Sequence, residues 1–163
     1  MAVEGTSLTV GDDVMIASNV EIHTDDAHPI FDVESGRRIN WSKNVDIGNH
    51  VWIASRAIIR PGTSIGDGSV VGLNSIVKGR FPNNCIIAGT PARVVRRNVA
   101  WERPHLSNSK PFYKPDASTV KKSKYWNLTE VEARPVTAKL TPWARIKRRA
   151  RHHKKQLIGL MRN

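Results

Sequence analysis

The strongest constraint in this sequence is an aliphatic residue that returns at every sixth position. Six such positions follow one another in phase from Ile47 to Val77, and the same period occurs earlier at Val10, Ile16 and Ile22. The fifth place of the later units is small or β-branched, and the second place is mostly small. A period of six fits neither an α-helix nor an alternating hairpin, and it is typical of a parallel β-helix of hexapeptide units.

Three hexapeptide units would make one triangular turn, with the aliphatic side chains inside the prism and the small residues at its corners. Stacked turns then bury a continuous aliphatic column, which serves as the core. A sandwich of short antiparallel strands is the alternative, but a sandwich does not hold a fixed six-residue phase. Aromatic residues are 6% of the chain, and 11 Gly and 9 Pro suit a turn-rich fold. The sequence therefore predicts an all-β chain with about three full turns of β-helix.

The charge of the chain is unevenly distributed. Residues 1–100 hold ten Lys or Arg and ten Asp or Glu, whereas residues 101–163 hold 16 basic and four acidic residues, which is the whole net charge of +12. This asymmetry indicates two segments with different roles. We expect a β-helical domain over residues 1–98 and a basic extension over residues 99–163.

Other features limit the cellular setting. The single cysteine, Cys85, excludes an internal disulfide and is expected to be a buried, inert thiol in a reducing cytoplasm. We find no apolar run as long as a membrane span and no signal peptide in the first residues.

Residues 24–44 interrupt the repeat and are too long for a corner turn. We expect them to form a loop that leaves the prism and returns at Val45, and loops on rigid scaffolds often carry function. The loop contains His28 followed by Pro29. An imidazole titrates near neutral pH, which suits a general base. The group that would orient the imidazole stays open among Asp26, Asp32, Glu34 and a backbone carbonyl.

Several stretches of the chain resemble a known family. These are "IASNVEIHTDDAHPIFD", "IGNHVWIASRAIIRPGTSIGDGSVVG", "SIV" and "NNCIIAGTPARVVR". Between about Ser7 and Pro104 the chain resembles the hexapeptide-repeat acyltransferases, in particular the galactoside, maltose, xenobiotic and capsular-polysaccharide O-acetyltransferases. The resemblance implies a left-handed β-helix, an acetyl-CoA donor, a sugar or polysaccharide acceptor, and a homotrimer with sites between its subunits. It also implies that His28 is the general base.

The same resemblance suggests the donor site. Trp52 of "NHVWI" would flank the acyl and pantetheine arm of coenzyme A, with Ala54 and Ser55 beside it. Arg93 and Arg96 of "TPARVVR" would meet the phosphates, since Arg matches phosphate geometry. Leu73 belongs to "GLNS", where the family commonly has "GAGS", so a bulkier residue would line the pantetheine. A second departure is "VKGRFP" in place of "VTKDIP".

The acceptor side is the least determined part, because only about nine residues precede the first repeat. Residues that could contribute to it are Glu4, Asn19 and Glu21.

The basic extension has its own pattern. Tyr113, Tyr125 and Trp126 could anchor it on the prism. Residues 142–161 predict a basic amphipathic helix, with Thr141 as its cap. Such a helix suits contact with an anionic membrane surface, and a solvated helix or a disordered tail remains the alternative. The extension has no recognised fold for reading bases, so we do not expect nucleic acid as a partner.

Two further functions stay open. The "GLNS" departure and short front would fit a non-catalytic β-helix that has lost its donor site and acts as an interaction module. His23, His28 and His50 also invite comparison with β-helical carbonic anhydrases, which bind zinc through histidines, two of them five residues apart. Their third ligand lies upstream of that pair, where this chain has no histidine, so we expect no metal site.

Overall fold

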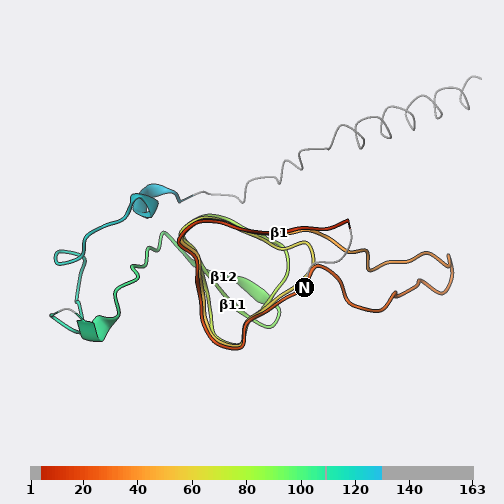
Figure 1. Ribbon diagram of the computed structural model, residues 1–163, viewed down its shortest axis with the longest axis horizontal. Coiled ribbons are helices and arrows are strands. Elements are labelled where there is room, and N and C mark those ends of the chain that lie inside the picture. The colour runs from red at the N-terminus through yellow and green to blue at the C-terminus, as the bar shows by residue number, and fades with distance from the viewer. Residues whose placement is uncertain (1–4, 109, 130–163) are drawn as a thin grey trace, which may run out of the picture.

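The computed structural model describes residues 5–108 and 110–129 of the 163-residue chain. The chain winds through three parallel sheets that form the faces of a triangular prism (Figure 1). This confirms the predicted left-handed β-helix. Within the described residues the helical elements are two short 3-10 turns, η1 (Leu106–Asn108) and η2 (Lys124–Asn127). The predicted helix over residues 142–161 lies outside them.

Each sheet stacks strands from successive turns. The first contains β1 (Leu8–Val10), β4 (Val45–Ile47), β7 (Ser64–Ile65) and β10 (Arg80–Phe81). The second contains β2 (Met15–Ile16), β5 (Trp52–Ile53), β8 (Val70–Val71), β11 (Cys85–Gly89) and β12 (Ala92–Arg97). The third contains β3 (Glu21–Ile22), β6 (Ile58–Ile59) and β9 (Ile76–Val77). All pairs are parallel except β11 with β12, an antiparallel hairpin that ends the β-helix.

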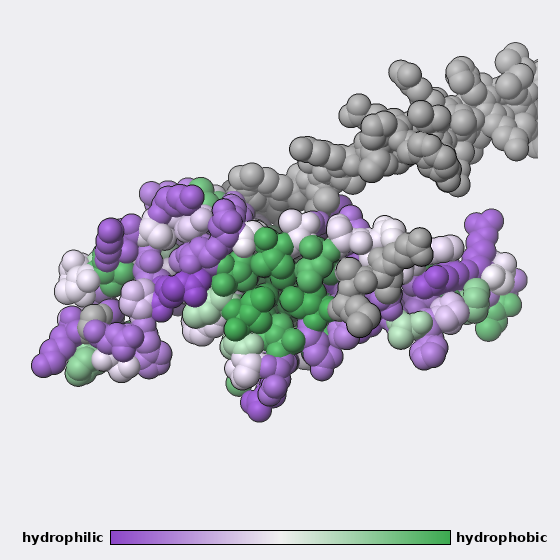
Figure 2. Space-filling view, viewed as in Figure 1, coloured by the Kyte–Doolittle hydropathy of each residue, from purple (hydrophilic) through white to green (hydrophobic). Residues whose placement is uncertain are grey.

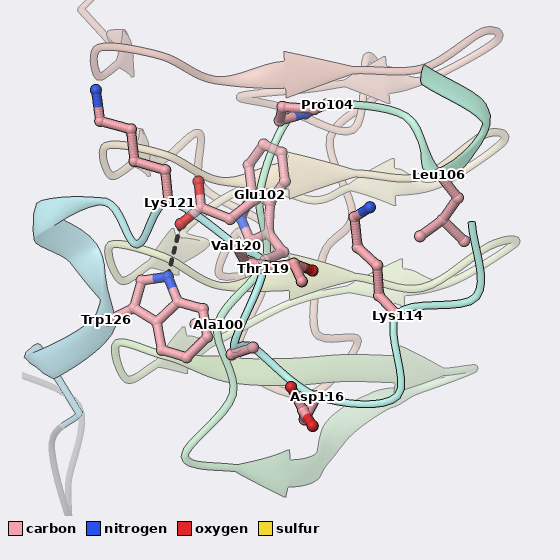
Figure 3. Close-up of a pocket in the computed structure, with 12 residues that line it drawn as sticks. Ala100, Glu102, Pro104, Leu106, Lys114, Asp116, Thr119, Val120, Lys121 and Trp126 are labelled. Atoms are coloured by element: carbon pink, nitrogen blue, oxygen red, sulfur yellow. Dashed lines mark hydrogen bonds between the residues drawn. The ribbon is translucent and has the colours of Figure 1, made fainter. Parts of the chain in front are cut away.

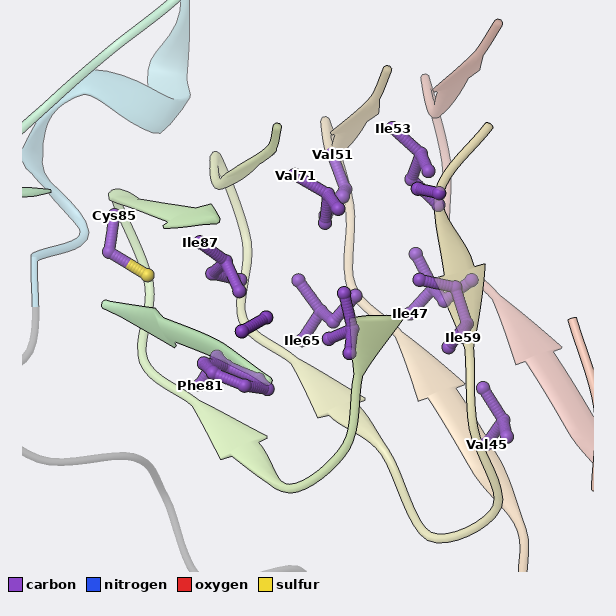
Figure 4. Packing of buried hydrophobic residues seen from close by; sticks show 13 residues of the cluster. Val45, Ile47, Val51, Ile53, Ile59, Ile65, Val71, Phe81, Cys85 and Ile87 are labelled. Atoms are coloured by element: carbon purple, nitrogen blue, oxygen red, sulfur yellow. The ribbon is translucent and has the colours of Figure 1, made fainter. Parts of the chain in front are cut away.

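The aliphatic residues of the six-residue repeat form most of the hydrophobic core (Figure 4). Their side chains are at most 2% exposed from Ile47 to Val77, and so are the small residues of the fifth place. Two of those small residues bind carbonyls of the next turn: Thr63 Oγ1 donates to Val77 O at 3.0 Å and Ser69 Oγ to Pro82 O at 2.9 Å. Burial raises the pKa of Cys85, as expected for an inert thiol.

The corners follow a rule that the sequence analysis did not identify. In every unit from Ile47 to Ser75 the fourth residue has a positive φ, between 51° and 84°. These residues are His50, Arg56, Gly62, Gly68 and Asn74. The turn of the chain at each corner therefore depends on a left-handed residue in fourth place, a conformation that Gly and Asn adopt most readily.

The first turn of the prism is its exposed end. Val10 and Ile16 keep the repeat, but these two residues and the nearby Leu8 are 38–48% exposed, because no further turn covers them within the described residues. Figure 2 shows hydrophobic side chains gathered over this end of the prism.

Beyond β12 the chain forms an extended arm, residues 99–108 and 110–129, that packs back on the prism (Figure 1). Asn84 joins the two parts, since its Nδ2 donates to Val99 O at 3.0 Å and to Tyr125 O at 2.8 Å. Tyr125 is buried, as predicted for an anchor, whereas Tyr113 is 80% exposed and the prediction for it was wrong. Within the described residues, no helix is long and apolar enough to cross a membrane.

Candidate functional site

The predicted loop 24–44 leaves the prism between the third sheet and the first. Hydrogen-bonded neighbours in adjacent turns are 37 residues apart across the loop, against 18 between later turns, so the loop inserts 19 residues into one turn. A hydrogen bond closes the loop where it leaves the prism, since Lys43 N donates to Thr24 O at 2.8 Å. Figure 1 shows the loop projecting away from the prism, on the side opposite the arm.

The loop is a two-armed hairpin. Phe31 and Arg38 form an antiparallel bridge, and Ile39 N donates to Ile30 O at 2.9 Å. Asp32 closes the tip, because its Oδ1 accepts from Ser35 N at 2.8 Å and from Ser35 Oγ at 2.5 Å. These bonds lower the pKa of Asp32.

Asn40 holds the His28 segment in place. Its Oδ1 accepts from Ile30 N at 2.7 Å, and its Nδ2 donates to His28 O at 2.8 Å and to Asp26 Oδ2 at 3.3 Å. Asp26 in turn forms an ion pair with Arg60, which follows β6 on the prism. The backbone around His28 is therefore fixed from both the loop and the scaffold.

Two of the proposed orienting carboxylates are engaged elsewhere. Asp26 binds Asn40 and Arg60, Asp32 binds Ser35, and Glu34 is exposed at the hairpin tip. The His28 side chain is exposed to solvent. Within residues 5–108 and 110–129, no carboxylate forms a hydrogen bond with its ring.

The donor candidates lie together on the second sheet and its corner with the third. Trp52 is on β5 and 37% exposed, and Ala54 and Ser55 follow it at the corner. Leu73 sits 18 residues beyond Ser55, at the same corner one turn on, and is 55% exposed. Next to it Asn74 Oδ1 accepts from Arg56 Nε at 2.9 Å.

Arg93 and Arg96 lie on β12, the outermost strand of the same sheet, with exposed side chains. The six donor candidates thus share one side of the prism. His28 belongs to a different edge of the prism, between the third sheet and the first, so the chain by itself does not bring His28 and the donor candidates together.

The arm buries a histidine that sequence reasoning had weighed only as a metal ligand. His50, at the corner before β5, is 2% exposed and lies between the rings of Trp101 and Tyr125. Its Nδ1 faces Asp13 Oδ2 at 2.5 Å and its Nε2 faces Trp101 O at 3.0 Å. His23 pairs instead with Glu21 at 3.0 Å. Among the described residues, no three His, Cys, Asp or Glu side chains gather as a metal site.

A cavity of about 550 Å³ is built almost entirely by the arm (Figure 3). Its walls include the indoles of Trp101 and Trp126, and its charged groups are two lysines, Lys114 and Lys121, and two carboxylates, Glu102 and Asp116. Glu102 Oε1 accepts from Trp126 Nε1 at 2.6 Å, the bond drawn in Figure 3. The cavity was not predicted, since it depends on how an irregular segment folds back.

Comparison with known proteins gives one consistent result. The polysialic acid O-acetyltransferase of Escherichia coli O1:K1 is 44% identical over 97 residues, which are 60% of this chain and 32% of that protein. The solved structure of a polysialic acid O-acetyltransferase, OatWY, superposes with a TM-score of 0.58 at 39% identity, covering 66% of this chain and 51% of that one. A galactoside acetyltransferase in complex with coenzyme A gives a TM-score of 0.50 at 40% identity, covering 59% and 48%.

No family model matches the chain. The chain spans about a third to somewhat over half of the length of its curated relatives. The shared part is nevertheless substantial, and both the relatives and the hexapeptide β-helix described above agree on one group of proteins. Over the shared part, the chain is similar to polysialic acid and galactoside O-acetyltransferases.

Proposed function

We propose that this protein transfers an acetyl group from acetyl-CoA to a hydroxyl of a sugar, in a surface polysaccharide or its precursor. The observation that carries the proposal is a β-helix with a projecting His28 loop, in a chain similar to polysialic acid and galactoside O-acetyltransferases. One similar structure holds coenzyme A, which supports the choice of donor.

In this mechanism His28 acts as general base. A sugar hydroxyl is a weak nucleophile, and the imidazole takes its proton as the oxygen attacks the thioester carbonyl. The tetrahedral intermediate then collapses, the carbon–sulfur bond breaks, and the coenzyme A thiolate leaves and takes up the proton. Asn40 supports this step by fixing the backbone carbonyl of His28 at 2.8 Å.

The donor would lie along the second sheet. Trp52 flanks the pantetheine arm, Ala54 and Ser55 offer backbone contacts, and Arg93 and Arg96 bind the phosphates. Leu73 is half exposed at the same corner, and its side chain leaves less room for the donor than a small side chain would. Four of these residues are exposed, and Ala54 and Ser55 are half-buried at the corner beside them, which supports this arrangement.

The active unit is proposed to be a homotrimer with each site between two subunits. The loop carries five large hydrophobic side chains that are 51–96% exposed in the single chain, which suits burial against another copy. These residues are Ile30, Phe31, Val33, Ile39 and Trp41. A loop reaching a neighbouring prism would also bring His28 to a donor groove that its own chain does not offer it. We place the enzyme in the cytoplasm, with contact to the inner membrane surface through its basic extension.

The experiment is calorimetry with acetyl-CoA on the folded protein, followed by thiol release with and without a panel of sugars. We expect binding that weakens in Trp52→Ala and a release of thiol that sugars stimulate. A folded trimer that binds no acetyl-CoA would contradict the proposal. It would favour a non-catalytic interaction module, in which Leu73 and Asn74 close the donor groove.

A further inference from the structure

The arm returns to the β-helix at one aromatic stack. The His50 ring lies 4.1 Å from the Trp101 ring at an interplanar angle of 12°, and 4.7 Å from the Tyr125 ring at 6°. All three side chains are at most 9% exposed. The imidazole comes from a corner of the prism and both aromatic rings come from the arm, so this stack is one of the contacts that join the two parts.

Hydrogen bonds hold the His50 ring in this arrangement. Nδ1 faces a carboxylate oxygen of Asp13, and Nε2 faces the carbonyl oxygen of Trp101. One partner lies on the first turn of the prism and the other on the arm, so both parts of the molecule fix the imidazole.

The charged groups around the stack come from both parts of the molecule. Arg103 Nε donates to Asp13 Oδ1 at 2.9 Å and its guanidinium lies 5.9 Å from the Trp101 ring. The Lys124 ammonium lies 5.2 Å from the Tyr125 ring. The hydrogen bonds from His50 and Arg103 lower the pKa of Asp13.

Trp101 connects the aromatic stack to the proposed donor groove, because its ring also contacts the ring of Trp52. Its Nε1 donates to His50 O at 2.9 Å, which together with the stacking fixes the indole. The ring of Trp52 then lies 6.0 Å from that of Trp101 at an angle of 47°, within the range of a favourable tilted aromatic pair. A surface tryptophan on a strand can otherwise choose among several rotamers.

We propose that Trp101, held by His50 and Tyr125, is a positioning residue that orients Trp52 for the acyl donor. The arm is then part of the donor site, although it contributes no atom that must touch the donor. This inference rests on the proposed function, because it takes Trp52 as a donor-binding residue. The sequence alone did not suggest it, since His50 and Trp101 are 51 residues apart.

The two tyrosines of the chain provide a matched test. Tyr125 stacks on His50, whereas Tyr113 lies on the same arm and is 80% exposed. We expect Tyr125→Leu to weaken acetyl-CoA binding by about two- to tenfold, with kcat at saturating donor unchanged. Tyr113→Leu and Tyr125→Phe, which keeps the stacking ring, should bind as the native protein does. Melting temperatures of the variants establish that each is folded.

A second measurement needs no donor. The protein is labelled with 5-fluorotryptophan, and the Trp52 resonance is assigned with Trp52→Phe. Tyr125→Leu and Trp101→Phe should shift and broaden the Trp52 signal, and Tyr113→Leu should not. If the native protein binds no acetyl-CoA, the proposed function fails while this signal still tests the coupling of the rings. A Trp52 resonance and a donor affinity that are the same in Tyr125→Leu and Tyr113→Leu would overturn the inference.

Discussion

The repeating turns and the loop that interrupts them both contain isoleucines, but the turns bury these side chains and the loop exposes them. In the turns, Ile53 and Ile59 are fully buried, and their neighbours above and below continue the same column. In the loop, Ile30 and Ile39 are 51% and 63% exposed, and the hairpin is held by hydrogen bonds through Asn40 instead. The repeat therefore supplies stability without partners, whereas the loop presents apolar side chains that need a partner surface.

The largest effect should come from an isoleucine pair that contrasts the two regions. Ile59→Ala leaves a cavity in the column and should cost about 2–5 kcal/mol of unfolding free energy. Ile39→Ala removes the same atoms from an exposed loop and should cost under about 1 kcal/mol in the dissociated chain. Urea unfolding followed by circular dichroism measures both. Equal losses would mean that the loop, too, is part of the core.

The next effect concerns association. If the loop packs on another copy, the double substitution Phe31→Ser and Trp41→Ser should weaken trimer formation by about a hundredfold or more, because two large apolar side chains lose their burial. Analytical ultracentrifugation over a range of concentrations measures this. Phe112→Ser, at a 52% exposed position on the arm, is the control. A trimer that is unaffected by the double substitution would place the interface elsewhere.

A smaller effect is expected where the loop is organised. Asn40→Ala removes the bonds to Ile30 N and His28 O, so His28, the proposed base, is less well positioned. We expect kcat for acetyl transfer to fall about tenfold with little change in the acetyl-CoA dissociation constant. Asn127→Ala, on the arm, should leave kcat unchanged. Loss of donor affinity in Asn40→Ala would argue that the loop folds over the donor and does more than carry the base.

The smallest effect is a pH dependence of stability that arises from Asp13, where the prism and the arm are in contact. The pKa of Asp13 is lowered from 3.8, chiefly by the hydrogen bond from His50, so the unfolded chain takes up this proton at a higher pH than the folded one. Ionised Asp13 therefore stabilises the fold fully at pH values above its ordinary pKa. This stabilisation is lost as the pH falls through the lower pKa of Asp13 in the folded chain. Urea midpoints of the native protein should fall more steeply below about pH 4 than those of Asp13→Asn. Parallel curves would mean that Asp13 contributes nothing measurable.

The sequence predicted the parts of the molecule that depend on near neighbours. The six-residue repeat from Ile47 to Val77 predicted the prism, its core and the position of the loop, because each turn places its residues in the same environment as the turn before. The left-handed fourth place of each unit escaped notice, since His50, Arg56, Gly62 and Asn74 share a backbone conformation and no side-chain chemistry.

The candidate site was predictable only in part, and its residue roles remain predictions. His28 and Trp52 stood out by their motifs, but Asn40 and Arg60 did not, because their roles arise from hydrogen bonds across a hairpin and between a loop and the next turn. The stack of His50 on Trp101 and Tyr125 was missed for the same reason. Contacts between segments 51 and more residues apart leave no periodic trace in the sequence.

We propose that the loop supplies the general base to a scaffold that does not need the loop for its folding. The most direct test is the rate of acetyl transfer by His28→Ala, measured at saturating acetyl-CoA together with its melting temperature. We predict that kcat falls by about 10²- to 10⁴-fold while the melting temperature and donor affinity stay at the native values. A variant that transfers acetyl groups at the native rate would contradict the claim and exclude His28 as the base.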